Sequence, residues 1–116
     1  MTIESILKLK GTDVQTIAPE ASVKRAADWL RAKNIGALVV TRENAILGLV
    51  SEREIVHAFS RHGGEAGSMH VKDIMQHDVA CVRPETPLEE IVLLLQRRGV
   101  RHLAVLDHEE LVGVIS

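Results

Sequence analysis

The chain contains two copies of one unit, and this repeat constrains its fold more than any other feature of the sequence. Displacing the sequence by 65 residues places Pro19-Glu20 on Pro84-Glu85 and Gly48 on Gly113, without a gap between these points. Conservative apolar pairs fill the positions in between. The sequence therefore predicts two copies of one structural unit in tandem.

The first copy spans residues 1–61, the second spans residues 71–116, and residues 62–70 connect them. The connection contains three glycines and a serine, a composition typical of a flexible linker. The second copy ends at Ser116, which aligns with Ser51, so it lacks the helix expected after Ser51. We therefore expect that the natural gene product continues with a helix, or that a partner subunit covers the exposed apolar surface.

Each copy reads as strand, helix, strand, strand, and the first copy adds a second helix. The first helix of copy one carries apolar residues at positions i, i+3, i+4 and i+7, with Ser22 as the expected N-cap and Asn34 as its left-handed end. The apolar stripe of this first helix consists of Val23, Ala26, Ala27 and Leu30. The second helix of copy one, after Ser51, is expected to carry Ile55, Val56 and Phe59.

The first helix of copy two shows the same spacing. A capping box is expected at Thr86-Pro87-Leu88-Glu89, with proline at the first helical position. Gly99 then takes the place of Asn34. Two short apolar runs follow each of these helices and predict hairpin strands, so we expect an α+β fold. The stripe consists of Leu88, Ile91, Val92 and Leu95, and the runs cover residues 37–40, 46–50, 103–106 and 111–115.

Composition excludes several classes of protein. A net charge of -2, an aromatic content of 2% and the absence of a basic block argue against a nucleic-acid partner. No apolar run approaches the roughly 20 residues that span a bilayer, and the first residues lack the pattern of a secretory signal. A single cysteine, Cys81, rules out an internal disulfide framework, and its apolar neighbours predict a packed side chain. We therefore predict a cytoplasmic protein with no membrane partner.

No motif of an enzyme or of a metal site is present. A nucleophile with its base, or a paired set of carboxylates in a defined constellation, is missing from the sequence. The six histidines show neither an i, i+4 pair nor a cysteine at zinc-like spacing. We expect no catalytic residues, no metal ligands and no catalytic cofactor.

Three motifs, two of them duplicated, resemble the CBS domain family, named after cystathionine β-synthase, over nearly the whole chain. They are Gly48-Leu49-Val50-Ser51-Glu52-Arg53-Glu54, repeated in part as Gly113-Val114-Ile115-Ser116, the Asp-Val-x-x-Val/Ile-x-Pro-Glu opening of each copy, and the segment Gly99 to Val105. The resemblance implies a pair of pseudo-symmetric βαββα-like units packed sheet to sheet, the arrangement called a Bateman module, often paired again into a homodimer. It further implies a regulatory role without catalysis, with AMP, ADP, ATP, NAD(H) or S-adenosylmethionine bound between the two repeats.

The family's motif places Ser51, Arg53 and Glu54 at the start of a helix, where free N–H groups and the helix dipole favour a phosphate. A hydroxyl can bond ribose or phosphate, and a carboxylate three residues later can accept the hydrogens of a ribose diol. This sequence has Glu54 where the family usually has aspartate, which moves the carboxylate by about 1.5 Å. The alternative is structural, because Ser51-x-x-Glu54 is also a capping box that needs no ligand.

The resemblance also assigns an apolar slot for adenine in each copy. An alternative for Ile17 and Val82 is plain core packing. Arg101 could neutralise a phosphate, or could form a solvated rim with Arg97 and Arg98. The residues assigned to these slots are Thr16, Ile17, Ala18, Gly36 and Ala37 in copy one, and Val82, Arg83, Arg101 and His102 in copy two. Ser116, the counterpart of Ser51, is also assigned to the nucleotide site.

A rival function is a purely structural one, in which the pair dimerises and docks onto a partner without any small-molecule ligand. Leu93 and Leu94 lie outside the core stripe of the helix from Leu88 to Leu95, so that this helix is apolar around more than one face. A homodimer contact is the simplest reason for that extra apolar surface, and it is compatible with either function.

Overall fold

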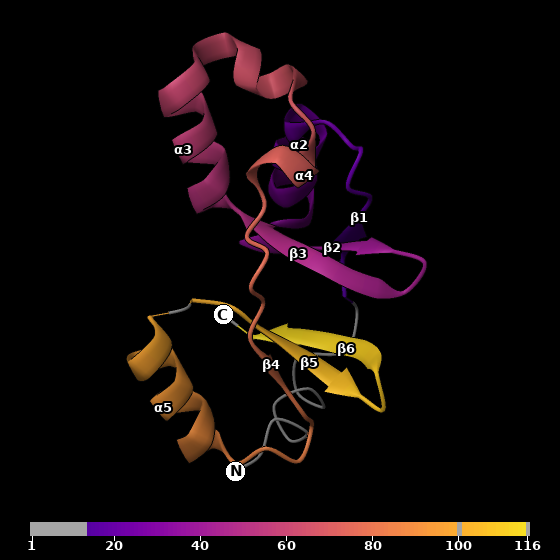
Figure 1. The fold of residues 1–116 in the computed structure, drawn as a ribbon, viewed down its shortest axis with the longest axis vertical. Coiled ribbons are helices and arrows are strands. Elements are labelled where there is room, and N and C mark those ends of the chain that lie inside the picture. Colours follow the sequence, from indigo (N-terminus) through magenta and orange to yellow (C-terminus); the bar gives the residue numbers. More distant parts are fainter. Residues whose placement is uncertain (1–13, 100, 116) are drawn as a thin grey trace. The chain divides into compact units, whose positions relative to one another are not determined.

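The computed structural model describes residues 14–99 and 101–115, and Ser116 lies outside them. These residues form two compact units, one of residues 15–78 and one that begins at Val79. Each unit has a three-stranded sheet, with the strand order β1-β2-β3 in the first and β4-β5-β6 in the second (Figure 1). The sheet of the first unit is accompanied by several helices, and that of the second, in the described residues, by the single helix α5 (Leu88–Arg98). The predicted α+β fold of two repeats is confirmed.

The two sheets follow the same plan, residue for residue. In each, a short first strand runs parallel to the second strand, and the second and third strands form an antiparallel hairpin. Thr16 pairs with Val39 in the first unit and Cys81 pairs with Ala104 in the second, as the repeat offset of 65 requires. The strands are β1 (Thr16–Ile17), β2 (Ala37–Arg42), β3 (Ala45–Ser51), β4 (Cys81–Val82), β5 (Leu103–Asp107) and β6 (Glu110–Ile115).

Both hairpins turn through two residues with positive φ. Glu43 and Asn44 have φ of 50° and 70°, and His108 and Glu109 have the same two values. Two successive left-handed residues make the turn whose twist matches that of the flanking strands. A bulge interrupts each hairpin at equivalent places, after Val40 and after Val105.

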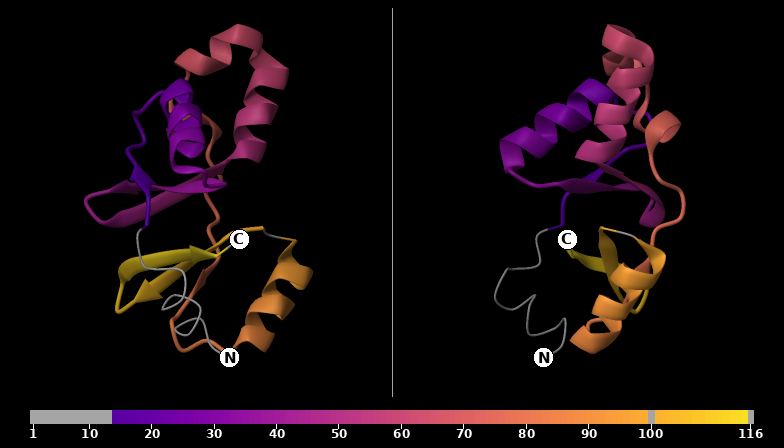
Figure 2. Two further views of the ribbon diagram at one scale, coloured as in Figure 1. Left: turned by 180° about the vertical axis from the view of Figure 1, so that it is seen from behind. Right: turned by 90° about the vertical axis from the view of Figure 1, so that its left-hand side faces the viewer.

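Helix α2 (Val23–Lys33) begins and ends as the sequence predicts. The Ser22 hydroxyl accepts the Arg25 N–H at 3.0 Å, which caps one of the free donors of the first turn. Asn34 ends the helix in the left-handed conformation, with φ of 53°. Figure 2 shows α2 and α3 (Glu52–His62) on the same face of the first sheet.

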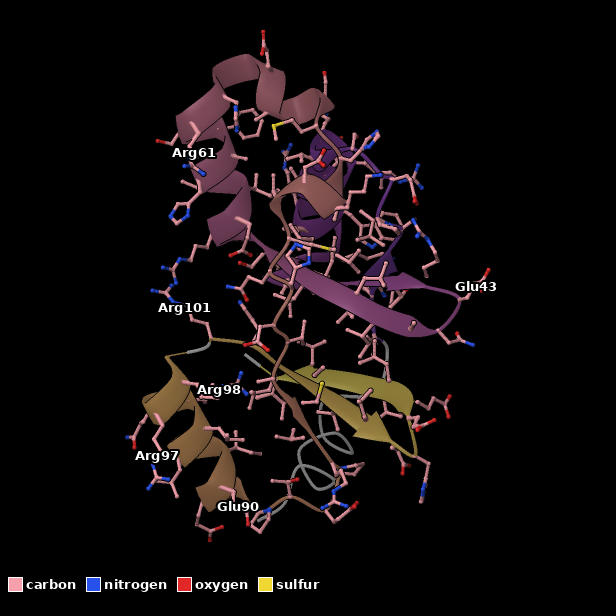
Figure 3. The ribbon with its side chains drawn as sticks, in the orientation of Figure 1. Glu43, Arg61, Glu90, Arg97, Arg98 and Arg101 are labelled. Carbon is pink, nitrogen blue, oxygen red and sulfur yellow. The ribbon has the colours of Figure 1, made fainter. Side chains whose placement is uncertain are left out.

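The prediction of a capping box at the start of α5 (Leu88–Arg98) is wrong. Pro87 stands at the N-cap without a side-chain hydrogen bond, and the Thr86 hydroxyl accepts the Arg83 N–H at 3.0 Å instead. Thr86 therefore stabilises the turn before the helix. Acidic side chains at its start and basic ones at its end suit the helix dipole, with Glu90 near one end and Arg98 near the other (Figure 3).

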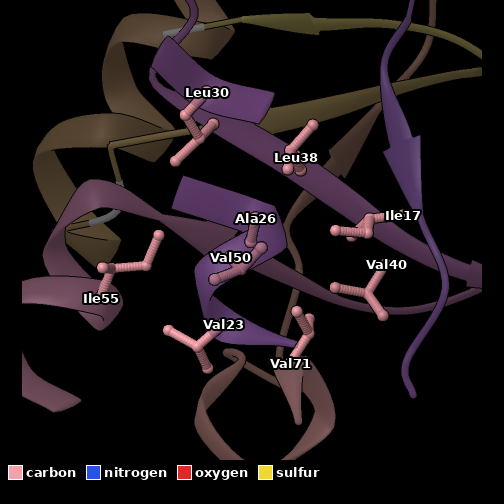
Figure 4. Packing of buried hydrophobic residues seen from close by; sticks show 9 residues of the cluster. All are labelled: Ile17, Val23, Ala26, Leu30, Leu38, Val40, Val50, Ile55 and Val71. Atoms are coloured by element: carbon pink, nitrogen blue, oxygen red, sulfur yellow. The ribbon is translucent and has the colours of Figure 1, made fainter. Parts of the chain in front are cut away.

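The core of the first unit lies between the sheet and its helices, and Figure 4 shows its nine buried side chains. Helix α2 buries three of the four predicted stripe residues, and Ala27 is partly buried. Helix α3 contributes Ile55, whereas Val56 and Phe59, also expected on this helix, are 63% and 40% exposed. The nine are Ile17, Val23, Ala26, Leu30, Leu38, Val40, Val50, Ile55 and Val71.

The connection between the repeats is structured. After α3, a 3₁₀ helix η1 (Gly63–Ser68) leads to a single turn, α4 (Val71–Ile74). The Val23 N–H donates to the Met69 carbonyl at 2.9 Å, and the Val71 N–H donates to the Ala21 carbonyl at 2.8 Å. Val71 itself is fully buried in the core of the first unit. The compact first unit therefore extends beyond residue 70, into the sequence assigned to the second copy.

The second unit has its own core beneath α5. Ile91 is the fully buried residue of this helix, and Leu94 and Leu95 pack partly against the cluster. Val92 and Leu93 are 44% and 46% exposed, so the expectation that Val92 belongs to the core is wrong. The buried cluster comprises Ala80, Val82, Ile91, Leu103 and Val105.

Among the residues that the structure describes, no helix has the length and apolar character needed to cross a membrane.

Candidate functional site

The motif around Ser51 lies where β3 ends and α3 begins. Ser51 is the last residue of the strand and the N-cap of the helix, and it is only 5% exposed. Its position is fixed by the hairpin, because Ser51 lies opposite Ala37 in the register of β2 and β3. The Glu52 N–H donates to the Gly36 carbonyl at 3.3 Å. The fold thus brings Gly36, Ala37 and Ser51 together at one end of the hairpin.

The polar groups of this motif bond one another. One carboxylate oxygen of Glu54, Oε1, accepts the Ser51 N–H at 2.7 Å and the Ser51 hydroxyl at 2.6 Å. The Ser51 hydroxyl oxygen in turn accepts the Arg53 N–H at 3.3 Å. This is the capping box that the spacing predicts, and it occupies donors that a phosphate would otherwise use. The Arg53 side chain remains exposed to solvent.

We expect Ser51→Ala to destabilise the first unit by about 1 to 2 kcal/mol, because it removes an N-cap whose oxygen is buried. Chemical denaturation of the variant measures this loss. Ser60→Ala, at an exposed position of α3, is the control and should change the free energy of unfolding by less than about 0.5 kcal/mol. Equal effects of the two substitutions would contradict a capping role for Ser51.

Gly48 has a structural role in the same motif. The segment Met75-Gln76 forms an antiparallel bridge with β3 here. The Leu49 N–H donates to the Gln76 carbonyl at 2.9 Å, and the Gln76 N–H donates to the Leu49 carbonyl at 2.8 Å. A Cβ atom at Gly48 would lie 2.4 Å from the Gln76 carbonyl oxygen and 2.7 Å from the Met75 sulfur. Glycine is therefore required for the close approach of these two backbone segments.

Three of the predicted residues line a pocket at the other edge of the first sheet. Thr16, Ile17 and Ala18 belong to β1 and the residue after it, and β2 separates β1 from β3. The structure therefore does not bring them together with Ser51. The pocket has a volume of about 340 Å³ and is completed by Ala21, Arg25 and Trp29. We call it the Trp29 pocket.

Arg25 and Trp29 were missed by the sequence reasoning. Trp29 is partly buried, its indole N–H donates to the Gln15 side-chain oxygen at 3.2 Å, and the Lys33 ammonium lies 5.4 Å from the ring centroid. A signal was present in the spacing, since Arg25, Trp29 and Lys33 recur every four residues and so share one face of the helix.

The described residues that were predicted for the second unit lie at different places on its sheet. Val82 is buried in the core and pairs with Val105 of β5. This position agrees with the alternative in which Val82 packs in the core. Arg83 follows β4, whereas Arg101 and His102 precede β5, so that they lie at opposite ends of these parallel strands. The Arg83 guanidinium lies 3.9 Å from the Glu85 carboxylate on the surface. Ser116 lies outside the described residues.

The expectation that Cys81 is packed is wrong, because its side chain is exposed. Partial desolvation nevertheless raises the pKa of the thiol above its ordinary value of 9.0, and the nearby charge of Arg98 opposes this only in part. The thiol is therefore protonated at neutral pH, and its sulfur lies 3.5 Å from the Val79 carbonyl oxygen.

Comparison with known proteins agrees with this geometry. The CBS domain model matches residues 6–61 and 71–116. A CBS-domain-containing protein of Agrobacterium tumefaciens, ATU1752, has a crystal structure that is 30% identical, with a TM-score of 0.94 over 100% of this chain and 93% of its own. The CBS domain-containing protein YhcV of Bacillus subtilis (strain 168) is 25% identical over 98% of this chain and 81% of its own length.

A further solved structure shares the fold at lower identity. The CBS domain pair of protein MJ0100 was crystallised in complex with 5-methylthioadenosine and S-adenosyl-L-methionine. It is 19% identical to this chain, with a TM-score of 0.88, and the match covers 100% of this chain and 89% of that one.

Proposed function

This chain belongs to the CBS domain family, whose paired domains are regulatory modules, and on that premise we propose that it binds an adenine nucleotide or a related adenosine compound in the cytoplasm. The candidate ligands are AMP, ADP, ATP, NAD(H) and S-adenosylmethionine. The ligands of MJ0100, which are both adenosine compounds, support this class. In this proposal the chain senses its ligand and carries out no catalysis.

The Trp29 pocket is the observation that carries the proposal. It combines three residues that the family resemblance assigns to adenine with an aromatic ring and a guanidinium group. Small-ligand sites have this make-up, in which a mainly apolar concave surface carries a few polar groups that fix orientation. Its volume of about 340 Å³ lies at the lower end of the usual range of roughly 300 to 1,000 Å³.

The motif at Ser51 offers fewer groups to a ligand than the family resemblance implies. Because the capping box already uses the Ser51 hydroxyl and Glu54 Oε1, a ligand must reach the motif mainly through the exposed Arg53 guanidinium. Contacts by Gly36 and Ala37 would then involve their backbone groups at the same end of the hairpin. Contacts by Arg83, Arg101 and His102 in the second unit stay part of the proposal.

We expect at least one adenosine compound to raise the melting temperature. A ligand at about one hundred times its Kd stabilises the folded state by about 2.7 kcal/mol if it does not bind the unfolded chain. A thermal-shift panel of AMP, ADP, ATP, NAD, NADH and S-adenosylmethionine measures this, and GMP serves as a control of the same charge as AMP. If none of the six shifts the melting curve at millimolar concentration, the ligand-binding proposal is wrong.

A structural module is the second candidate, because apolar side chains are exposed on two helices. Val92 and Leu93 of α5, and Val56 and Phe59 of α3, are each at least 40% exposed. Exposed apolar side chains of this kind often mark protein contacts. A partner of the same sequence would cover them without any small molecule.

We expect the protein to be a homodimer that Leu93→Glu shifts toward the monomer, since a carboxylate would be buried without a partner in an apolar contact. Size exclusion with light scattering measures the mass across a range of concentrations. Gln96→Glu, which adds the same charge at an exposed polar position of α5, should leave the mass unchanged. A monomeric mass at every concentration would exclude the dimer.

A further inference from the structure

The Trp29 pocket has room for one mononucleotide-sized molecule. It lies between β1, the segment that follows it and the first turns of α2, and all of its lining residues come from the first unit. At about 340 Å³ it is close to the smallest volume that small-molecule sites usually have. A dinucleotide such as NAD, with two bases and two riboses, exceeds a space of this size.

The pocket offers a flat aromatic surface whose polar atom is already bonded. The indole N–H of Trp29 donates to Gln15, so the ring contributes its apolar and π surface to the lining. The Lys33 ammonium lies over the ring, which helps to hold the ring in place. Ile17 and Ala18 supply the apolar surface nearby. Base stacking on an aromatic side chain suits such a surface, because every base has a π face.

The pocket also carries a positive charge that is not neutralised. Within the described residues, no carboxylate lies within ion-pair distance of the Arg25 guanidinium. The nearest acidic groups along the chain are engaged elsewhere, because Asp28 pairs with Lys24 at 2.6 Å and Glu20 pairs with Arg42. The first turn of α2 contains no acidic residue, so the positive end of the helix dipole adds to the charge of Arg25.

From these features we infer that the Trp29 pocket binds a nucleoside monophosphate, with its base against Trp29 and its phosphate at Arg25. The inference rests on the proposed function, which supplies adenine as the base and hence AMP as the ligand. The planar guanidinium fork of arginine matches the oxygens of a phosphate. The same charge disfavours the sulfonium of S-adenosylmethionine, and adenosine lacks the group that Arg25 would bind.

Titration with AMP while tryptophan emission is recorded tests this inference directly. Trp29 is the single tryptophan of the chain and there is no tyrosine, so emission reports on this pocket alone. We expect a saturable change in emission. Arg25→Gln should weaken AMP binding about tenfold, the loss of one charge-assisted contact, and should leave adenosine binding within about twofold. Arg25 is exposed, so this variant should fold like the wild type.

Arg31→Gln is the matched control, because Arg31 is an exposed arginine of the same helix that does not line the pocket. It should bind AMP within about twofold of the wild type. If AMP raises the melting temperature while emission stays constant and both variants bind normally, the ligand is bound elsewhere. The inference then fails and the proposed function stands. If no adenosine compound binds by either method, both fail.

Discussion

Gly48→Ala should destabilise the first unit by about 3 kcal/mol or more. The added methyl group would lie 2.4 Å from the Gln76 carbonyl oxygen, so that one of two backbone segments must move. Overpacking of this kind costs about 1 to 3 kcal/mol, and each of the two Leu49–Gln76 backbone bonds adds about 1 kcal/mol if it breaks. Urea denaturation followed by circular dichroism measures the loss.

Gly64→Ala is the control for that experiment. Gly64 has no positive φ, and a Cβ atom there would meet nothing within 4 Å. The substitution should be neutral or slightly stabilising, because alanine lowers the entropy of the unfolded chain. If Gly48→Ala were as well tolerated as Gly64→Ala, the segment at Met75 and Gln76 could not be packed against β3 as described.

Leu38→Ala should cost roughly 2 to 5 kcal/mol of unfolding free energy. Leu38 is 0% exposed and lies in the centre of the first core, among side chains from the sheet and both helices (Figure 4). The cavity left by the lost side chain adds to the lost burial of apolar surface, because a close-packed core relaxes only in part. Differential scanning calorimetry or denaturant titration measures the change.

Val56→Ala is the control for Leu38→Ala. Val56 is 63% exposed on α3, so removing two of its methyl groups leaves no cavity, and alanine suits a helix better than valine. The free energy of unfolding should change by less than about 0.5 kcal/mol. A cost at Leu38 as small as this would contradict the packed core described above.

The repeat made most of the fold predictable from the sequence. An offset that aligns Gly48 with Gly113 also aligns the strand pairings, both bulges and both turns. Local signals with a clear mechanism were equally informative, namely the cap at Ser22, the left-handed Asn34 and the capping box at Ser51. These features depend on residues near one another in the chain.

One error concerns a local feature. Thr86 has the residue type and spacing of a capping box, but its hydroxyl accepts the Arg83 N–H in the turn before the helix. The other errors concern features that depend on tertiary contacts. Val92 fits the helical period, yet the sheet of the second unit is covered mainly by Ile91 with Leu94 and Leu95. Arg25 and Trp29 become pocket residues only because β1 packs beside α2. The spacing along a helix shows which residues share a face. It does not show which other segment of the chain packs against that face.

The burial of Val71 in the first core determines where the chain can be divided into folded parts. Comparison of the copies divides the sequence near residue 70, whereas the compact unit continues to Asp78. The sequence repeat and the compact unit therefore have different boundaries. A fragment that ends at residue 70 would lack Val71 and the turn α4, and with them part of the first core. A fragment that ends at Asp78 would keep both.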